Sequence, residues 1–124
     1  MPNAIAVDFD GVIHKYSKGW QDGSIYDPPM EGVKEALSNL ISEGYEIVIF
    51  STRCYSRKIK GVEQKSQAKE VEEYLKKYKI PYTNIHTEGC KPFCKAFIDD
   101  RAIRFENWSD AFIEVKELIK TKGI

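Results

Sequence analysis

Near its N-terminus the chain reads Ile5-Ala6-Val7-Asp8-Phe9-Asp10-Gly11-Val12-Ile13, an apolar run that contains two carboxylates and a glycine. A short apolar run that ends at Gly is typical of the central strand of a covered parallel sheet. In an extended backbone Asp8 and Asp10 lie on the same face, about 6.6 Å apart along the strand. We therefore expect both acids at the tip of a buried strand, close enough to act on one metal ion or one phosphoryl group.

Two later apolar runs also end in polar or charged side chains. Glu46–Phe50 is followed by Ser51-Thr52-Arg53, and Ala96–Ile98 is followed by Asp99-Asp100-Arg101, with Lys91 in the loop between the two runs. An amphipathic helix is predicted between the first two strands, from Glu31 to a stop at Gly44. Because a strand–helix–parallel strand unit brings both strand ends to one edge of the sheet, Ser51 is expected beside Asp8.

In this order the motifs resemble those of the haloacid dehalogenase-like (HAD) phosphohydrolases, which carry D-x-D-x-[TV], a strand ending in Ser or Thr, a Lys and an acidic pair. The resemblance spans Ile5 to Arg104, nearly the whole chain. It implies an α/β fold with a Rossmann-like parallel sheet of about five strands and helices on both faces. The intervals between the motifs leave no room for a cap, so residues 1–124 are expected to form a single capless domain.

The resemblance also implies a chemistry, the hydrolysis of a phosphate monoester by a Mg²⁺-dependent phosphatase. Asp8 would attack phosphorus to form an aspartyl phosphate, and Asp10 would act as general acid and then as general base. The implied catalytic residues are Asp8, Asp10, Ser51 and Lys91, and the implied substrate-binding residues are Thr52 and Arg53. The implied magnesium ligands are Asp8, Asp10 through its backbone carbonyl, Asp99 and Asp100. Carboxylate oxygens are the ligands that Mg²⁺ prefers.

Several of these roles have competitors in the sequence. Ser51 and Thr52 are also favoured as helix N-caps. Lys95 competes with Lys91, but in a strand that ends at Asp99 its side chain starts about 13 Å from the acidic tip. Two other function classes stay open: a receiver-like domain that accepts a phosphoryl group, and a catalytically idle binding module on the same fold.

The remaining segments are expected to support this site. Residues 14–30 form a long irregular loop, predicted to be a lid over the site, an anchor held by Trp20 and Tyr26, or both. A basic linker is predicted at 57–61, a helix at 63–78, short strands at 83–86 and 103–105, and a closing helix at 108–119 with Ser109 near its cap.

Composition places the chain among ordinary globular proteins. It has 124 residues, 42% of them hydrophobic and 31% charged, and a formal net charge of zero. A neutral chain has no overall attraction to nucleic acid or to an anionic membrane. What the resemblance and the open, capless site imply is a phosphorylated partner that is either a small molecule or the end of a nucleic acid. Without a cap, the chain is expected either to form a homo-oligomer that covers the site or to prefer a large substrate.

Cysteine usage and the N-terminus predict a cytoplasmic protein that does not enter membranes. Cys54, Cys90 and Cys94 are odd in number and are expected to be reduced thiols near the site. A metal site of His86, Cys90 and Cys94 is disfavoured because the chain lacks a close C-x₂-C pair. No run approaches the roughly 18 apolar residues of a membrane span, and the N-terminus leads directly into a strand.

Overall fold

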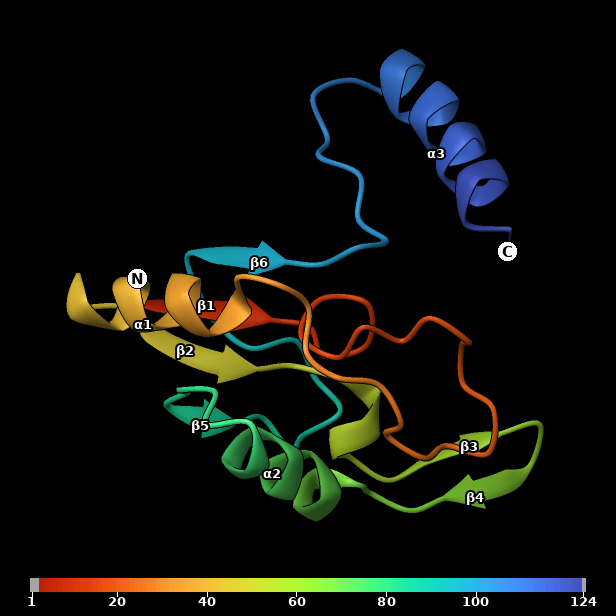
Figure 1. Ribbon diagram of the computed structural model, residues 1–124. Coiled ribbons are helices and arrows are strands. Elements are labelled where there is room, and N and C mark those ends of the chain that lie inside the picture. The colour runs from red at the N-terminus through yellow and green to blue at the C-terminus, as the bar shows by residue number, and fades with distance from the viewer. Residues whose placement is uncertain (1–2, 124) are drawn as a thin grey trace.

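The computed structural model describes residues 3–123 and confirms an α/β fold with a parallel sheet (Figure 1). The sheet has four strands in the order β5-β2-β1-β6. Their bounds are β1 (Ala4–Val7), β2 (Glu46–Ile49), β5 (Asn84–Ile85) and β6 (Ala96–Ile98). The three apolar runs expected to end in site residues are therefore three adjacent strands of one sheet.

Strand β1 lies in the middle of the sheet because its side chains are buried on both faces. Its last residue, Val7, pairs with Ile49 of β2 and with Ile98 of β6, so the three strands end level with one another. The order of the strands reverses at β1, with β2 and β5 on one side and β6 on the other. Ligands of open α/β sheets bind at the carboxyl ends of the strands beside such a reversal.

Two helices cover one face of the sheet, and no helix of the described chain covers the other. Helices α1 (Val33–Ser42) and α2 (Ala68–Lys77) bury Leu37 and Leu75 against the odd-numbered side chains of β1 and β2. On the opposite face Cys94 packs against Ala4, Ala6 and Val48. The expectation of helices on both faces is wrong for residues 3–123, because the connection from β5 to β6, residues 86–95, crosses that face without forming a helix.

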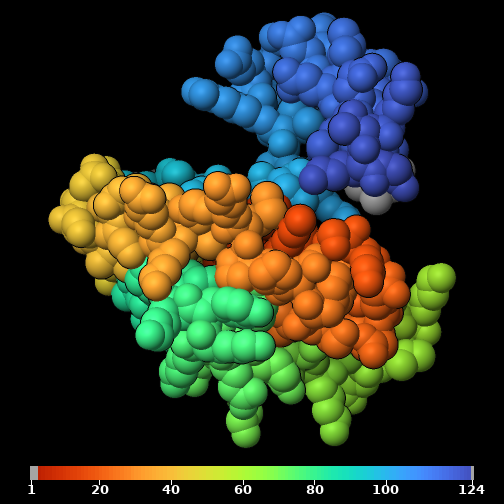
Figure 2. Space-filling model, in the orientation of Figure 1, coloured from red at the N-terminus to blue at the C-terminus, as the bar shows by residue number. Residues whose placement is uncertain are grey.

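The third helix, α3 (Trp108–Lys122), stands apart from the sheet (Figures 1 and 2). Asn107 caps it by accepting a hydrogen bond from the N–H of Asp110, and Ser109 lies near this cap, in the first turn, as expected. Residues 103–105, expected as a further strand, are irregular, because the chain leaves the sheet after β6 and they meet no neighbouring strand. None of the helices in residues 3–123 combines the length and the apolar character that crossing a membrane requires.

Residues 57–64 form a β-hairpin instead of the expected linker and first helical turn. Strands β3 (Arg57–Ile59) and β4 (Val62–Gln64) pair antiparallel across Lys60 and Gly61. Both turn residues have positive φ, 50° and 79°, as a type I′ hairpin turn requires. Helix α2 therefore begins only at Ala68, and the hairpin projects from the carboxyl end of the sheet (Figure 1).

Candidate active site

Three carboxylates meet at the carboxyl ends of β1 and β6. Asp8, Asp99 and Asp100 each offer an oxygen within 4.8 Å of the others. Asp8 is held by the N–H of Phe9, which donates to its Oδ1 at 2.8 Å. Three hard oxygen donors on adjacent strand ends fit a divalent cation such as Mg²⁺. The structure thus brings together three of the four acids expected to bind metal.

Burial, more than the neighbouring acids, raises the pKa of Asp8. Burial raises its pKa to about 7, and the neighbouring charges of Asp99, Asp100 and Asp10 act in the same direction, against the N–H of Phe9. Near neutral pH the carboxyl group is therefore partly protonated when no cation lies beside it. A cation bound between the carboxylates would favour the ionised form, which is the one that can ligate metal or attack phosphorus.

Gly11 is needed for the close approach of Asp100 to the first motif. It has a φ of +81°, and a Cβ atom at this position would overlap the carboxylate of Asp100. Asp99 and Asp100 each have a further polar contact, one local and one from α3. The N–H of Arg101 donates to Asp99 Oδ1 at 2.7 Å, and Lys122, near the end of α3, lies 2.9 Å from Asp100 Oδ2.

The carboxylate of Asp10 turns away from this cluster and is held by two buried side chains. His14 Nδ1 lies 2.9 Å from its Oδ1, and Arg53 Nε donates to its Oδ2 at 2.7 Å. His14 and Arg53 are both fully buried, and Asp10 itself faces the cavity described below. Its side chain therefore lies beside the three clustered carboxylates without joining them, and the group of Asp10 expected at the metal stays its backbone carbonyl.

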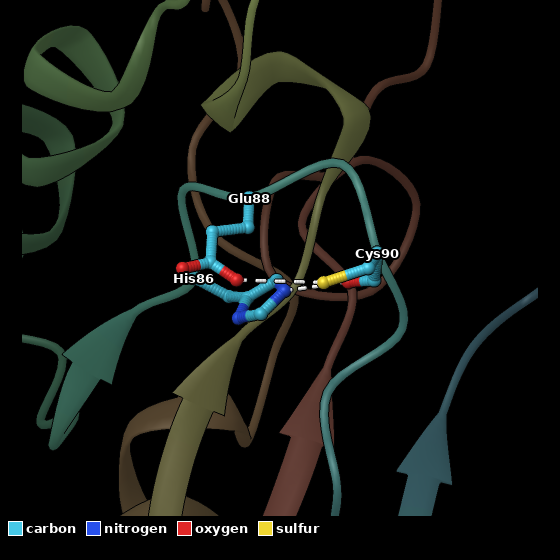
Figure 3. Close-up of side chains that lie close together, drawn as sticks. All are labelled: His86, Glu88 and Cys90. Atoms are coloured by element: carbon cyan, nitrogen blue, oxygen red, sulfur yellow. Dashed lines mark hydrogen bonds between the residues drawn. The ribbon is translucent and has the colours of Figure 1, made fainter.

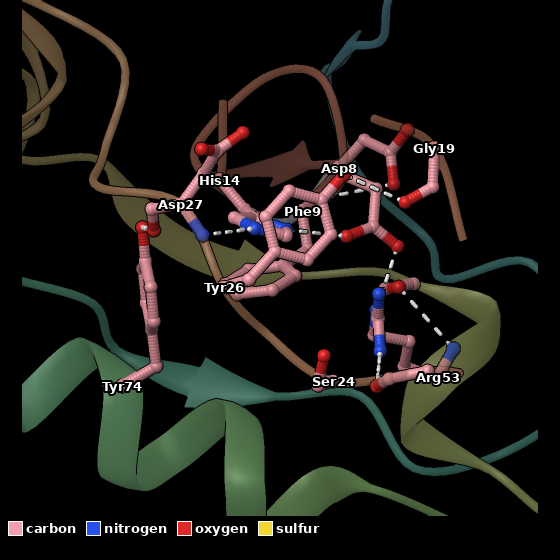
Figure 4. A network of polar contacts seen from close by, with 12 residues as sticks. Asp8, Phe9, His14, Gly19, Ser24, Tyr26, Asp27, Arg53 and Tyr74 are labelled. Atoms are coloured by element: carbon pink, nitrogen blue, oxygen red, sulfur yellow. Dashed lines mark hydrogen bonds and ion pairs between the residues drawn. The ribbon is translucent and has the colours of Figure 1, made fainter. Parts of the chain in front are cut away.

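The hydrogen bonds of His14 define its tautomer. The N–H of Asp27 donates to His14 Nε2 at 3.1 Å, so the ring proton is on Nδ1 and is donated to Asp10 (Figure 4). The ring is enclosed by Phe9, Tyr26 and Tyr74, with centroids 5.2 to 5.7 Å away. Tyr74 of α2 also donates its hydroxyl hydrogen to the carbonyl of Asp27. This packing links loop 14–30 to the core and fixes the orientation of Asp10.

Arg53, expected to bind substrate, does not line the cavity. After β2 the chain makes a short 3₁₀ turn, η1 (Thr52–Cys54), which directs Arg53 inward. Its Nη1 donates to the carbonyl of Gly23 at 2.6 Å and to Gln67 Oε1 at 3.2 Å, while Nη2 has no partner among the described residues. Arg53 therefore orients Asp10 and contacts loop 14–30 through the carbonyl of Gly23.

Ser51 and Thr52 do lie on the cavity. Ser51 Oγ accepts the N–H of Arg53 at 3.2 Å, so it caps η1, as the alternative interpretation of this residue predicted. Capping uses the oxygen only as an acceptor, which leaves the hydroxyl hydrogen available to an oxyanion in the cavity. The two interpretations of Ser51 are therefore compatible.

Lys91 is not brought to this cavity. Its ammonium lies 4.6 Å from the ring centroid of Phe97 in β6. The exposed aromatic face offers the cation a contact close to its own loop, on the side of the sheet that carries the 86–95 segment. Among the described residues, the lysine that pairs with one of the three clustered carboxylates is instead Lys122, which no motif singles out.

A second polar cluster, formed by His86, Glu88 and Cys90, lies within the 86–95 segment. His86 Nε2 lies 2.6 Å from the carbonyl oxygen of Cys90, and the Cys90 thiol donates to Glu88 (Figure 3). Cys54, Cys90 and Cys94 are all free thiols, and burial raises the pKa of Cys54 to about 11. Cys94 packs under the sheet and takes no part in the cluster.

The acids open into a cavity of about 560 Å³ whose other walls the motifs did not reveal. These walls are formed by Tyr16, Trp20, Phe50, Arg57, Ile59 and Arg101. Loop 14–30 fits the anchor interpretation at Tyr26, whose hydroxyl donates to the carbonyl of Gly19, while Trp20 faces the cavity. Two sequence signals pointed to this wall: the aromatic residues in the loop after the first acid pair, and Arg101 directly after the second.

Comparisons of the chain with protein-family models, with curated proteins and with solved structures found no match. The chemistry of the site is therefore inferred from its own side chains. They offer a carboxylate set for a divalent cation, a hydroxyl for an oxyanion, and a second acid held by two buried groups.

Proposed function

We propose that the protein is a Mg²⁺-dependent phosphatase of the HAD type, which hydrolyses a phosphate monoester through an aspartyl phosphate on Asp8. The observation that carries the proposal is the meeting of Asp8, Asp99 and Asp100 at the ends of β1 and β6, on a cavity that Asp10 and Ser51 also line. Such an arrangement holds a carboxylate nucleophile beside a metal site and a separate acid.

The reaction takes two steps. In the first, an Asp8 oxygen bonds to phosphorus while the ester bond breaks, and Asp10 gives its proton to the leaving oxygen. In the second, Asp10 takes a proton from water, the water oxygen bonds to phosphorus, and the bond to Asp8 breaks to release phosphate. Asp8, Asp99, Asp100 and the backbone carbonyl of Asp10 would hold Mg²⁺, which would neutralise charge between the two anions.

The remaining groups bind the phosphoryl oxygens. The Ser51 hydroxyl donates without adding charge. A direct role for Lys91 requires the 86–95 segment to carry its ammonium from Phe97 to the cavity. Arg53 acts through Asp10.

Turnover of p-nitrophenyl phosphate tests the proposal. Hydrolysis should require Mg²⁺, stop on addition of a chelator, and be abolished by Asp8→Asn. Asp22→Asn is the matched control, because Asp22 is an exposed acid of loop 14–30 that does not line the cavity. Undiminished hydrolysis by Asp8→Asn would sink the assignment.

Asp10→Ala separates the two steps. Because p-nitrophenolate leaves without protonation, this variant should phosphorylate Asp8 but hydrolyse the acyl phosphate slowly. We expect a burst of about one product equivalent per site and, after acid quench, one added phosphoryl group by intact-mass measurement. Phosphate on Ser51 or Thr52, or turnover equal to the parent, would overturn these roles.

The same measurement addresses the two other classes. A receiver-like phosphoacceptor would take one phosphoryl group and keep it in the parent protein. An idle binding module would take none. Steady turnover by the parent distinguishes an enzyme from both.

A further inference from the structure

The part of the cavity lining that is apolar has a composition that phosphoryl transfer by itself does not need. Tyr16, Trp20, Phe50 and Ile59 all line it. Its volume of about 560 Å³ is within the usual range for drug-sized ligands and exceeds what a phosphate group fills. The apolar wall is therefore available to the part of a substrate that leaves the phosphate.

Trp20 is held in place while much of its ring stays accessible. The Arg53 guanidinium lies 4.5 Å from the ring centroid, and that of Arg57 lies 5.7 Å away. The ring also packs so closely on Gly23 that a Cβ at this position would approach it to 2.9 Å. Even so, Trp20 is 38% exposed. A rigid indole with free area is a preformed surface for stacking a planar group, because little side-chain entropy is lost when a ligand binds.

The hairpin supplies the other side of the same space. Ile59 of β3 is 48% exposed although it is apolar, and it lines the cavity with Arg57. Arg57 Nη1 donates to the carbonyl of Thr52, which directs the guanidinium toward the site and leaves its other N–H groups available. Arg101 adds a second guanidinium to the lining. Flat cationic groups beside an aromatic ring suit a heteroaromatic ring with hydrogen-bond acceptors.

We propose that the substrate is a nucleoside monophosphate, free or as the phosphorylated terminal nucleotide of a strand, whose base stacks on Trp20. This assignment of substrate class rests on the proposed phosphatase function for the phosphate end. The phosphate lies at Asp8 and Ser51, and the base lies between loop 14–30 and the β3–β4 hairpin. Sugar phosphates without a base forgo the stacking contact and are poorer substrates.

The kinetic test compares two esters that differ by the base. The ratio of kcat/KM for adenosine 5′-monophosphate to kcat/KM for ribose 5-phosphate should exceed one in the parent. In Trp20→Leu it should fall by about 5- to 150-fold, the loss that corresponds to 1–3 kcal/mol of base stacking. Trp20→Phe keeps an aromatic ring and should restore part of the ratio. Trp108→Leu removes an exposed tryptophan of α3 and should leave the ratio unchanged. An unchanged ratio in a folded Trp20→Leu variant overturns the proposal.

A binding measurement removes the dependence on catalysis. In Asp8→Asn combined with Trp108→Leu, Trp20 is the only tryptophan, because the chain has two. Adenosine 5′-monophosphate with Mg²⁺ should quench its fluorescence saturably, and ribose 5-phosphate should not. If this variant shows quenching but the parent hydrolyses no ester, the substrate class is supported and the phosphatase proposal is wrong. If the parent hydrolyses esters without preferring those with a base, and the variant shows no quenching, the phosphatase proposal is supported and the substrate class is wrong.

Further substrates distinguish the two sources of the same chemistry. Mononucleotides phosphorylated at the 3′ or 5′ position are compared with short oligonucleotides that end in the same phosphate. A higher kcat/KM than for ribose 5-phosphate supports the proposal. Whether the mononucleotides or the oligonucleotides show the larger increase identifies which of them is the substrate. Equal turnover of these esters and of ribose 5-phosphate overturns it.

Discussion

The two groups that hold Asp10 are unusual in being fully buried yet polar. Arg53 contacts the carboxylate from η1, and His14 contacts it from loop 14–30. Burying a guanidinium is costly unless its partners are well placed, and Nη2 is left without one among the described residues. Such a cost at the floor of a cavity is consistent with a role in orienting Asp10 for proton transfer.

We predict that Arg53→Lys impairs catalysis in proportion to the need of the leaving group for a proton. Lysine cannot reproduce the planar set of donors that reaches Asp10, Gly23 and Gln67. For an alkyl phosphate kcat/KM should fall by up to about 100-fold, within the range that general acid catalysis supplies, and for p-nitrophenyl phosphate by much less. Arg104→Lys, at an exposed position, is the control. Equal losses on the two esters would show that Arg53 does not act through Asp10.

The raised pKa of Asp8 predicts that the metal-free protein loses stability as pH rises. Between the ordinary value of 3.8 and the folded value of about 7 the folded state binds more protons than the unfolded state. The free energy of unfolding therefore falls with rising pH across this window and levels off above it. Asp8→Asn, which cannot ionise, should be more stable than the parent above about pH 7, by on the order of 2 kcal/mol after allowance for solvent screening, and similar to it below about pH 4.

Thermal or denaturant unfolding of both proteins in chelator, over that pH range, measures the difference. Comparison with the parent removes the contributions of other titrating groups. A difference that stays constant with pH would mean that the Asp8 carboxyl keeps its ordinary pKa in the folded protein.

Among the elements, α3 reaches the acids only through its last turn. Lys122 pairs with Asp100, one of the three carboxylates at the candidate metal site. A lysine that neutralises a metal ligand competes with the metal for it. The helix therefore bears on the site through its C-terminal charge and not through its apolar face.

Lys122→Ala should strengthen Mg²⁺ binding. A partly exposed ion pair contributes up to about 1 kcal/mol, which corresponds to a gain in affinity of up to about fivefold. Titration of the unfolding temperature with Mg²⁺ measures this without reference to activity. Lys120→Ala, in the same turn but without an ion pair among the described residues, is the matched control. Weaker Mg²⁺ binding in Lys122→Ala would instead make Lys122 a supporting residue of the site.

In the whole molecule, helix α3 forms a separate lobe (Figure 2). Residues 99–107 link it to the sheet. The helix exposes several large apolar side chains, Trp108, Phe112, Ile113, Val115 and Ile119. Within residues 99–107 no strand or helix protects the backbone. Segments with few buried contacts open at the lowest free energy.

Limited digestion with trypsin should therefore cut first after Arg101 or Arg104. Mass spectrometry of early time points should find a fragment that ends at one of these residues, together with the released α3 peptide. First cuts after Arg57, Lys58 or Lys60 would show instead that the hairpin opens more readily than the linker.

Several features follow from neighbours along the chain. Apolar runs that end in polar residues predicted the strands β1, β2 and β6 and the acids that follow β1 and β6, because short apolar runs favour strands. The parallel arrangement then brought Asp8 and the Asp99-Asp100 pair together, since parallel strands end at the same edge. The family resemblance and the phosphatase chemistry that it implies stay predictions, tested by the experiments on Asp8 and Asp10.

Other features depended on contacts between residues far apart in the chain, which no local pattern encodes. Arg53 points inward because it bonds to Asp10 and to the carbonyl of Gly23, which both lie far from it in the sequence. Lys91 contacts the ring of Phe97 and Lys122 pairs with Asp100. Lysine side chains are long and flexible, so their partners depend on which groups the fold places nearby. Local sequence is therefore enough to predict that β1 and β6 end in acids. Which cation and which aromatic side chains lie beside these acids depends on contacts that form only in the folded chain.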